Sequence, residues 1–556
     1  MRAALSHDST PTTDVLIVGA GPVGLTLAIG LARAGVDCRI IERDDAFRTA
    51  GVRGKGVNPR TLEVFDDLGV VARILDRGVL DLKVRAYEGT RLVQEFDPGA
   101  TRPTTPDRPY AGMLMIAQHH TEAVLRDRLA EYGVKVETGS ELTDCTQDSD
   151  HTYAQDAAGI QDTAGARDTA GVLATVRQGD RTAQLRARFL VGCDGGRSTV
   201  RKLAGIPFLG ETWEEERFIM ASMDLDGLDP DHMHLWNHPK FGAGAMAIVP
   251  MRQDGKWAVH AAVEPDEHGE LPAPTLATFR RLFAERAGLP GVRMHEPIWS
   301  TVWRPTVRLV ERYRDGRVLL AGDAAHCQSA AGGQGMNTGI QDAHNLAWKL
   351  AAVLRGAPAE LLDSYQEERR PIALAGLAAT SAHHKAAFRG DGATVLTEQF
   401  RTLAVQGADL TGLSIDYRGG PLGRDLDDAT GIRAGDRAPN APCSTADGTP
   451  VRLFDLFRGP HFTLLAFGDH PAPADPADPA HPSGQSDPTG SSARSVLQDL
   501  PGLRVAAVRD PDGHAARAYG LRGEAVVLVR PDGYVSLTGA SVDRTTLTEH
   551  LRAFAV

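Results

Sequence analysis

The strongest constraint on the fold is a glycine-rich turn that joins a buried strand to a helix near the start of the chain. Residues 14–19 (DVLIVG) are a continuous apolar run ending in glycine, which is typical of a strand inside a parallel sheet. Residues 24–34 (GLTLAIGLARA) predict a helix that stops at Gly35, and residues 36–42 (VDCRIIE) predict the next strand. The three segments form a complete βαβ unit, which makes an α/β fold the expectation.

The turn itself has the sequence GAGPVG, in which Gly19, Gly21, Pro22 and Gly24 are the expected contact residues. Glycines allow a tight turn, a close approach of the backbone to a pyrophosphate, and close helix packing. The helix N-terminus adds free amides and a positive potential. Glu42, with Arg43 beside it, ends the second strand 18 residues after Gly24, where a carboxylate can bind ribose hydroxyls. The pattern therefore predicts a dinucleotide site, without saying which dinucleotide binds.

Length and composition bound the other possibilities. The chain has 556 residues, enough for two to four domains, and a formal charge of −12, which argues against nucleic acid or an anionic membrane as a partner. No apolar run has the length of a signal peptide or a membrane span. None of the five cysteines pairs at the spacing of a metal site or a redox dithiol, so we expect no metal, reduced thiols and a cytoplasmic protein.

Several later segments also have readable patterns. Residues 147–171 hold an imperfect repeat with few apolar side chains, which predicts a surface insertion. Residues 469–494 are a second break in composition, rich in Pro, Ala, Asp, Gly and Ser. The apolar runs 245–251 and 257–263 predict a hairpin in a second, antiparallel sheet. Residues 317–321 predict another buried strand, followed by a long helix over 335–354.

Two further motifs follow predicted strands. The first is Gly192-Cys-Asp194-Gly195-Gly-Arg-Ser198, and the second is Gly322-Asp323-Ala-Ala-His326 followed by Gly332-Gly-Gln-Gly-Met-Asn337. With the first turn, and in this order, they resemble the flavoprotein aromatic hydroxylases, the family of para-hydroxybenzoate and phenol hydroxylases and polyketide-tailoring oxygenases. The resemblance covers about residues 12 to 380.

The resemblance implies a specific division of the chain. A Rossmann-like FAD-binding domain would be assembled from residues 12–80, 112–205 and 306–380. An antiparallel-sheet substrate domain would be inserted as residues 81–111 and 206–305. A helical connection would span 381–434, and a thioredoxin-like domain would span 435–556. That last region has no Cys-x-x-Cys, which excludes disulfide exchange and favours a structural or homodimer-stabilising role.

The resemblance also implies roles for individual residues. Glu42 matches the acid on the adenosine ribose, and Arg53 matches an arginine near the phosphates and flavin. Gln118 matches a cofactor contact, Asp194 with Gly195 matches the second motif, and Asp323 matches the aspartate that binds the ribityl chain. For the two aspartates the competing interpretation is a helix cap or a surface charge.

The segment that opens the helix at residue 335 has a physical role of its own. The backbone amides of Gly335, Met336 and Asn337 at a helix N-terminus would stabilise negative charge on the pyrimidine edge of reduced flavin. His326 is a candidate for proton transfer, although packing near the cofactor is the commoner role at such a position. Candidate substrate contacts are the side chains that could line an aromatic pocket but could equally be core: Trp236, Met246, Trp299 and Trp303.

The reaction implied by the resemblance consumes NADPH or NADH and O2. The nicotinamide would bind transiently and reduce FAD, oxygen would form a flavin hydroperoxide, and an aromatic or polycyclic small molecule would be hydroxylated. Baeyer–Villiger oxygenation of a polycyclic ketone is the alternative within this cofactor class, and a non-catalytic flavin-binding protein is the alternative outside it. Ser329 and Ala330 stand where many relatives have prolines. Their presence is either neutral, with the two residues following the same backbone path, or it gives a looser wall beside the flavin, because proline fixes its own backbone angle.

Overall fold

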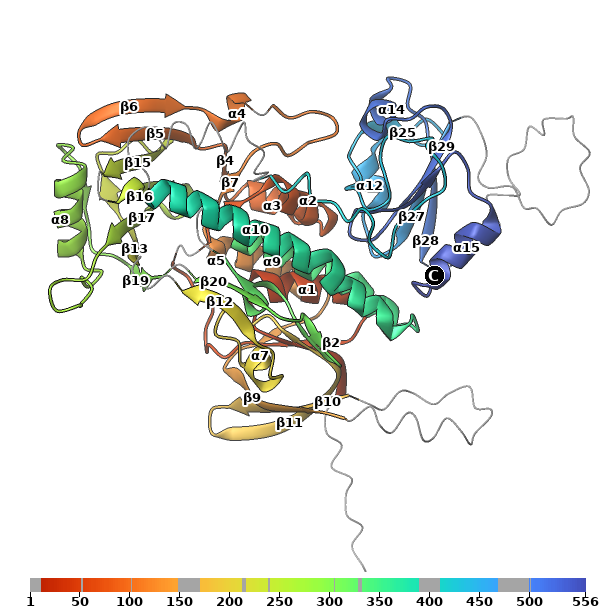
Figure 1. Ribbon diagram of the computed structural model, residues 1–556, viewed down its shortest axis with the longest axis horizontal. Helices are drawn as coiled ribbons and strands as arrows, with labels where there is room; N and C mark the ends of the chain where they lie inside the picture. Colours follow the sequence, from red (N-terminus) through yellow and green to blue (C-terminus); the bar gives the residue numbers. More distant parts are fainter. Residues whose placement is uncertain are drawn as a thin grey trace, which may run out of the picture.

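The first βαβ unit lies at the centre of an eight-stranded sheet in the computed structural model (Figure 1). Strand β1 (Thr12–Val18) pairs in parallel with β2 (Cys38–Ile41) on one side and with β11 (Arg181–Gly192) on the other. Strand β22 (Val318–Leu320) extends the parallel set beyond β11. The side chains of β1 from Val15 to Val18 are buried, as the unbroken apolar run predicted.

The structure describes residues 12–51, 54–101, 103–148, 171–212, 217–238, 241–304, 306–328, 333–389, 411–468, 500 and 502–556. Arg53, Ser329, Ala330, most of the 147–171 repeat and the 469–494 segment fall outside these ranges. Within the described ranges, no helix combines the length and the apolar composition that a membrane crossing requires.

Three helices pack on the parallel sheet. Helix α1 (Pro22–Arg33) contacts both α5 (Gln118–Glu131) and α9 (Gly335–Leu354). A Cβ on Gly30 would lie 2.6 Å from the Cβ of Ala347, so α1 and α9 approach more closely than an alanine would allow. Helix α10 (Asp363–Arg389) then crosses the molecule and contacts α9 and the second sheet (Figure 1).

The second sheet has seven strands in the order β19-β13-β17-β16-β15-β5-β6. The predicted hairpin is confirmed as β16 (Gly242–Met251) and β17 (Lys256–Val263), joined through the short helix η2 (Arg252–Asp254). The sheet is antiparallel except between β15 and β5. Its other strands are β5 (Lys83–Glu88), β6 (Arg91–Phe96), β13 (Arg217–Met223), β15 (His232–His238) and β19 (Trp299–Trp303).

Alternation along these strands gives the second sheet two different faces. One face forms a hydrophobic core with helix α8 (Leu276–Arg286), at the left edge of Figure 1. The other face carries a smaller cluster with Ala117, the residue before α5, and so faces the part of the chain built on the parallel sheet.

The C-terminal part is built on a five-stranded sheet in the order β24-β30-β29-β27-β28. Strands β27 (Phe462–Phe467) and β28 (Leu503–Val508) are parallel, whereas β29 (Ala525–Val529) and β30 (Val535–Gly539) form the predicted hairpin. Strand β24 (Arg424–Asp425) pairs with β30, and residues 411–434 contain no helix, so the expected helical connection is wrong for that stretch. Its residues belong instead with the C-terminal sheet.

The C-terminal part shares a core with α9. Trp348 and Ala352 of α9 belong to one hydrophobic cluster with Leu464, Leu528 and other residues of the C-terminal sheet. Beside it lies a buried ionic network in which the Arg530 guanidinium contacts Glu368 of α10 at 2.6 Å and Asp532 at 2.5 Å. The contact between the C-terminal part and helices α9 and α10 is therefore buried and packed like a protein core.

The remaining elements are short connections or edge pieces. They are β3 (Gly56–Val57), α2 (Pro59–Asp67), α3 (Val71–Leu75), β4 (Val79–Leu80), α4 (Pro98–Thr101), β7 (Leu114–Met115), β8 (Val136–Glu137), β9 (Ser140–Gln147), β10 (Val172–Gln178), α7 (Thr199–Leu203), β12 (Phe208–Thr212), β14 (Leu225–Asp226), β18 (Arg293–Met294), β20 (Thr306–Val310), β21 (Arg314–Asp315), η3 (Gly322–Ala324), β23 (His326–Cys327), η4 (Ala359–Leu362), β25 (Pro442–Ser444), β26 (Pro450–Arg452), α12 (Leu453–Phe457), α14 (His514–Tyr519) and α15 (Arg544–Arg552).

Candidate functional site

Four sequence motifs meet at one edge of the parallel sheet. Val18, Ile41, Gly192 and Leu320 are in register at the ends of β1, β2, β11 and β22. Because these strands are parallel, the residues that follow them share the carboxyl edge, which is where ligands bind in open α/β sheets. Gly19, Glu42, Asp194 and Asp323 therefore form a row, although they are spread over some 300 residues of sequence.

The first turn fits a pyrophosphate. Gly19 has φ +102°, and a Cβ there would lie 2.6 Å from the Cys193 carbonyl oxygen. A Cβ on Gly24 would lie 2.0 Å from the Gly19 carbonyl oxygen, so both positions require glycine. Gly21, just before Pro22 at the start of α1, is different, because a Cβ there would meet no atom within 4 Å. Open space at Gly21, beside the N-terminus of α1, is the cradle that a phosphate would fill.

Glu42 is held in place by the same turn. Its carboxylate accepts hydrogen bonds from the backbone N–H groups of Ala20 at 2.9 Å and Asp44 at 3.1 Å. A carboxylate has lone pairs for further donors, so this geometry leaves room for a hydroxyl pair. Arg43 points elsewhere: its side chain is 62% exposed and pairs with Asp44 at 3.8 Å.

Asp194 serves the protein's own backbone. Its carboxylate accepts from the Ser198 hydroxyl at 2.5 Å and from the backbone N–H groups of Thr199 at 2.6 Å and Val200 at 3.1 Å. Burial raises the pKa of Asp194, while these hydrogen bonds oppose the rise. The geometry favours the cap interpretation for Asp194, and the adjacent Gly195, with φ +79° and open space at its Cβ position, is the point of close approach.

Asp323 lies in η3, where the chain leaves β22, and its side chain is exposed. Its Oδ1 atom lies 3.9 Å from the position of a Cβ on Gly335, so it faces the start of α9. Gly322 and Gly339 are packed against Val23, which brings η3 and α9 onto α1. An exposed carboxylate between two helix N-termini suits a hydroxyl-rich chain.

The start of α9 is fixed by Asn337. Its Oδ1 accepts from the Asn58 backbone N–H at 2.9 Å, and its Nδ2 donates to the Gly56 carbonyl at 3.0 Å. The first N–H groups of a helix, here those of Gly335, Met336 and Asn337, have no acceptor within the helix. They can stabilise negative charge, as the sequence predicted.

Gln118 joins this group from the other side. Its Oε1 accepts from the Gly54 backbone N–H at 3.1 Å, and its own N–H donates to the Gly54 carbonyl at 3.0 Å. A Cβ on Gly54 would lie 3.2 Å from the Met336 sulfur. Residues 54–56 are thus clamped between the first turns of α5 and α9; Arg53 lies outside the described residues.

His326 is a packing residue in this structure. Its side chain is 1% exposed, and its Nε2 lies 2.6 Å from Asp342 Oδ2. The other oxygen of Asp342 accepts from Arg369 Nε at 2.8 Å. Burial alone would raise the pKa of Asp342, but the charges of His326 and Arg369 hold it below its ordinary value. The geometry supports the packing interpretation over proton transfer.

The substrate candidates separate onto two faces. Trp236 and Met246 are fully buried in the core under α8, where Trp236 stacks on Tyr87 with ring centroids 5.0 Å apart. The prediction that these two residues contact substrate is therefore wrong, because strand alternation turns both side chains towards α8 and away from the parallel-sheet part. Trp299 and Trp303 are half-buried on β19, and the indole of Trp299 lies 3.2 Å from a Cβ position on Gly51. These two remain candidates.

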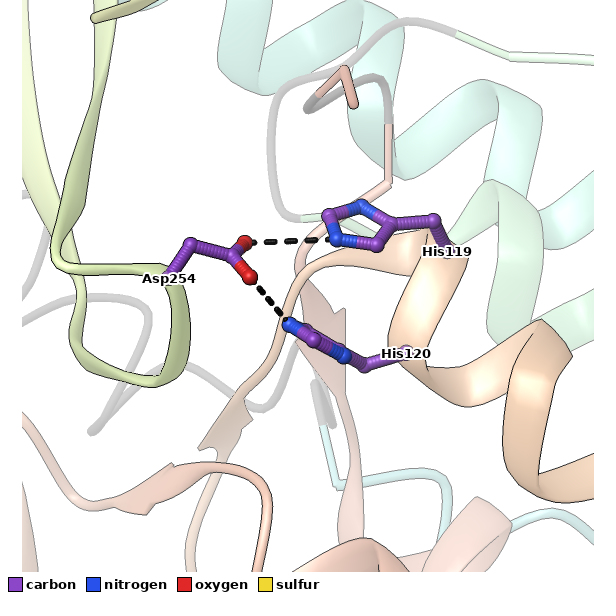
Figure 2. Close-up of side chains that lie close together, drawn as sticks. All are labelled: His119, His120 and Asp254. Carbon is purple, nitrogen blue, oxygen red and sulfur yellow. Dashed lines mark hydrogen bonds and ion pairs between the residues drawn. The ribbon is translucent and has the colours of Figure 1, made fainter. Parts of the chain in front are cut away.

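A cluster that the sequence did not single out ties the two parts together (Figure 2). The Nε2 atoms of His119 and His120, in the first turn of α5, lie 3.3 Å and 2.5 Å from the carboxylate of Asp254 in η2. The ligand types and spacing of the three side chains are those of a group that could hold a metal ion. In this structure the 2.5 Å contact is a hydrogen bond, so the cluster links η2 of the second sheet to the first turn of α5.

Lys55 and His260 are two further residues that sequence reasoning missed. Lys55 Nζ lies 2.8 Å from His260 Nε2, across the boundary between the clamped loop and β17. Neither residue belongs to a motif, and the only signal was a lysine between two glycines in the segment RGKG.

The comparisons with known proteins agree with this geometry. Residues 12–380 match the family model described as "FAD binding domain", and residues 432–555 match "Aromatic-ring hydroxylase, C-terminal". This chain belongs to the FAD-dependent aromatic-ring hydroxylases. A flavin-dependent monooxygenase of Mycobacteroides abscessus is 37% identical to it over 96% of this chain and 98% of that protein.

Two other relatives are also long matches. The 6-methylpretetramide 4-monooxygenase of Streptomyces rimosus is 35% identical over 97% of this chain and 93% of its own. The solved structure of aklavinone-11 hydroxylase with FAD and aklavinone superposes with a TM-score of 0.77, at 27% identity and 98% coverage of both chains. The predicted fold class is thereby confirmed for this aromatic-ring hydroxylase.

One cofactor contact is directly testable. We expect Asp323→Ala to weaken FAD binding by about 1.5–3 kcal/mol, the range for a hydrogen bond to a charged group. The measurement is the FAD dissociation constant by flavin fluorescence after dialysis. Asp315→Ala is the matched control, because Asp315 is a surface aspartate on β21 that pairs with Arg312. Unchanged FAD affinity in Asp323→Ala would remove this residue from the site.

Proposed function

We propose that this protein is a monooxygenase that uses FAD, NADPH or NADH, and O2 to hydroxylate an aromatic or polycyclic small molecule. The observation that carries the proposal is the position of the site. The row of strand ends and the first turn of α9 belong to the part of the chain that meets the second sheet, where Ala117 packs with Val249 and Ala258 and where Lys55 contacts His260. The proposal puts the cofactor at the strand ends and the reacting ring at this boundary.

Bound FAD would accept hydride equivalents from the nicotinamide and activate oxygen. The chain's own residues have three tasks. Gly21 and the start of α1 hold the pyrophosphate, with Glu42 on the ribose. The amides at Gly335–Asn337 stabilise negative charge on the flavin's pyrimidine edge. The apolar face of the second sheet that carries Val249 and Ala258 would cover the reacting ring and exclude water.

The substrate class is supported by what related proteins are named for. They include an anhydrotetracycline monooxygenase of Streptomyces rimosus and a pentachlorophenol 4-monooxygenase of Sphingobium chlorophenolicum, at 33% and 34% identity. The phenol named in the second of these enzymes is an aromatic ring that carries a hydroxyl group. A polycyclic substrate is the preferred candidate, because the relative that matches 97% of this chain at 35% identity is named a 6-methylpretetramide 4-monooxygenase.

The test is a screen of phenols and polycyclic quinones for stimulated NADPH and NADH oxidation, with oxygen uptake and product identification. The proposal expects a substrate that raises both rates and gains one oxygen atom. Product NMR separates a new phenol carbon from the ester or lactone of a Baeyer–Villiger reaction. Bound yellow FAD with no substrate-stimulated NAD(P)H oxidation would instead identify a flavin-binding protein.

A further inference from the structure

The Lys55–His260 contact lies where the FAD-binding part meets the second sheet. Lys55 follows Gly54, which is clamped by Gln118, and precedes Gly56, whose carbonyl accepts from Asn337. Its backbone carbonyl accepts from Ile116 at 2.9 Å, so the main chain on both sides is fixed. The side chain is therefore directed from the clamped loop to β17, 205 residues later in the sequence.

The face that receives Lys55 is almost entirely apolar. His260 pairs across the sheet with Ala247 on one side and Met220 on the other, and Met220 pairs in turn with Thr301. On β17 its same-face neighbours are Ala258 and Ala262. His260, Ala247 and Thr301 are half-buried and Met220 is buried, so the side chains around the imidazole are small or apolar. Such a surface accepts a flat apolar ring and offers it one polar group.

The lysine has no carboxylate partner among the described residues. His260 of β17 contacts its amine, while the loop on either side is held by Gln118 of α5, which also bonds Glu122, and by Asn337 of α9. Burial lowers the pKa of Lys55 to about 8, and burial followed by the Lys55 charge lowers the pKa of His260 well below its ordinary value. A neutral imidazole thus accepts from the amine, and an anion is the ligand that would complete the site.

We propose that Lys55, held by His260, binds the acidic hydroxyl of a phenol or enol substrate and takes its proton. This inference rests on the proposed function and assigns its substrate class. The substrate O–H bond breaks, an N–H bond forms on Lys55 Nζ, and the electron pair stays on oxygen. The phenolate is held by the new ammonium group, and its ring becomes more electron-rich at the ortho and para carbons, which are the positions to be hydroxylated.

The experiment measures binding of 1,8-dihydroxyanthraquinone to the FAD-loaded enzyme, without NAD(P)H. Its colour changes when a hydroxyl ionises, so one spectrum reports affinity and protonation state together. The matched probe is its dimethyl ether, which has no acidic proton. We expect the wild-type enzyme to bind the hydroxyl probe as an anion at a pH where the free probe is neutral, and to bind it more tightly than the ether.

Variants assign the effect to this pair. Lys55→Met should weaken binding of the hydroxyl probe by about 10- to 150-fold and leave it protonated, while the ether binds as before. Lys55→Arg should keep a positive charge and therefore retain binding of the anion. His260→Gln retains an acceptor and should lose less than His260→Phe. Flavin absorbance and thermal unfolding show that each variant is folded and loaded.

Two results would overturn the inference. One is a wild-type enzyme that binds the hydroxyl probe no tighter than the ether, or binds it neutral. The other is a folded Lys55→Met variant that still binds the anion with wild-type affinity. Either result leaves the proposed monooxygenase intact, since turnover is measured separately. Absence of turnover with every substrate would count against the proposed function without touching this binding result.

Discussion

Replacing Arg530 with methionine is expected to lower the free energy of unfolding by about 3–5 kcal/mol, the cost of leaving buried charges without a partner. The Arg530 guanidinium donates to both oxygens of Glu368, at 2.6 and 2.9 Å, and its Nε donates to Asp532 at 2.9 Å. All three side chains are at most 2% exposed. Methionine fills the volume and leaves two buried carboxylates near each other. Among the described residues Lys349 is then the cation that pairs with Glu368, and Asn345 and Trp348 donate neutral hydrogen bonds.

Urea unfolding, followed by circular dichroism and by flavin fluorescence, is the measurement. Arg281→Met is the control, because Arg281 and its partner Glu285 are 55% and 52% exposed, and it should change stability by no more than about 0.5 kcal/mol. Arg530→Lys should fall between the two, since it keeps the charge and loses the planar fork. If Arg530→Met were as stable as the control, the network would not hold the C-terminal part in place.

The same ionic network makes the free energy of unfolding depend on pH in the acid range. Burial would raise the pKa of Glu368, but the Arg530 and Lys349 charges outweigh it and hold that pKa below its ordinary value. A lowered folded-state pKa stabilises the protein above the unfolded pKa of about 4.3, and this stabilisation is lost as pH falls through the folded-state value. Arg530→Met should therefore flatten the fall in unfolding free energy on the acid side.

Gly21→Ala and Gly24→Ala are expected to separate cofactor binding from folding, although the two glycines are three residues apart. At Gly24 the new Cβ would lie 2.0 Å from the Gly19 carbonyl, so the β1–α1 turn must move. We expect a loss of about 1–3 kcal/mol from overpacking and, with the turn displaced, no retained FAD. At Gly21 the backbone angles are φ −73° and ψ −176°, which alanine adopts freely, and the Cβ meets nothing.

Gly21→Ala should therefore leave the stability of the cofactor-free protein unchanged and weaken FAD binding, because its methyl group enters the space proposed for the pyrophosphate. Thermal unfolding of stripped protein and titration with FAD measure the two effects independently. Ala130→Ser, at an exposed position near the far end of α5, is the control, because it adds one atom away from the turn. Equal FAD affinity in Gly21→Ala and wild type would place the pyrophosphate elsewhere.

Local sequence patterns predicted the elements that carry the cofactor. The helix expected over 335–354 has those bounds, and the strands before Gly19, Gly192 and Gly322 are where their apolar runs indicated. These segments are readable because a buried parallel strand must be apolar throughout and a phosphate-binding turn must contain glycine. Each of these features lies within a few consecutive residues, so it can be predicted without knowing how distant segments pack.

The remaining features depend on contacts between residues that are far apart in the sequence, and local patterns do not predict them. Whether Trp236 faces α8 or the flavin side depends on strand register, and a shift by one residue would exchange the two faces. His260 has the same dependence, and its contact with Lys55 spans 205 residues. Arg530 and Glu368 look like surface charges in sequence, and only the docking of β29–β30 on α10 buries them. For Asp194, the local motif suggested a ligand contact, whereas α7 uses the carboxylate as a cap.

The core shared by α9 and the C-terminal sheet has a consequence for protein synthesis. Trp348 makes an edge-to-face contact with Phe554, at 5.8 Å between ring centroids, and another with Phe462. A nascent chain that has emerged from the ribosome as far as α10 must therefore keep one side of α9 uncovered, while the other end of the same helix is already part of the flavin site. Chains of this size usually fold one domain at a time, but here the first part cannot bury α9 completely until the C-terminal sheet has been synthesised. Chaperones that shield apolar surface, and FAD added during expression, should act on the same intermediate.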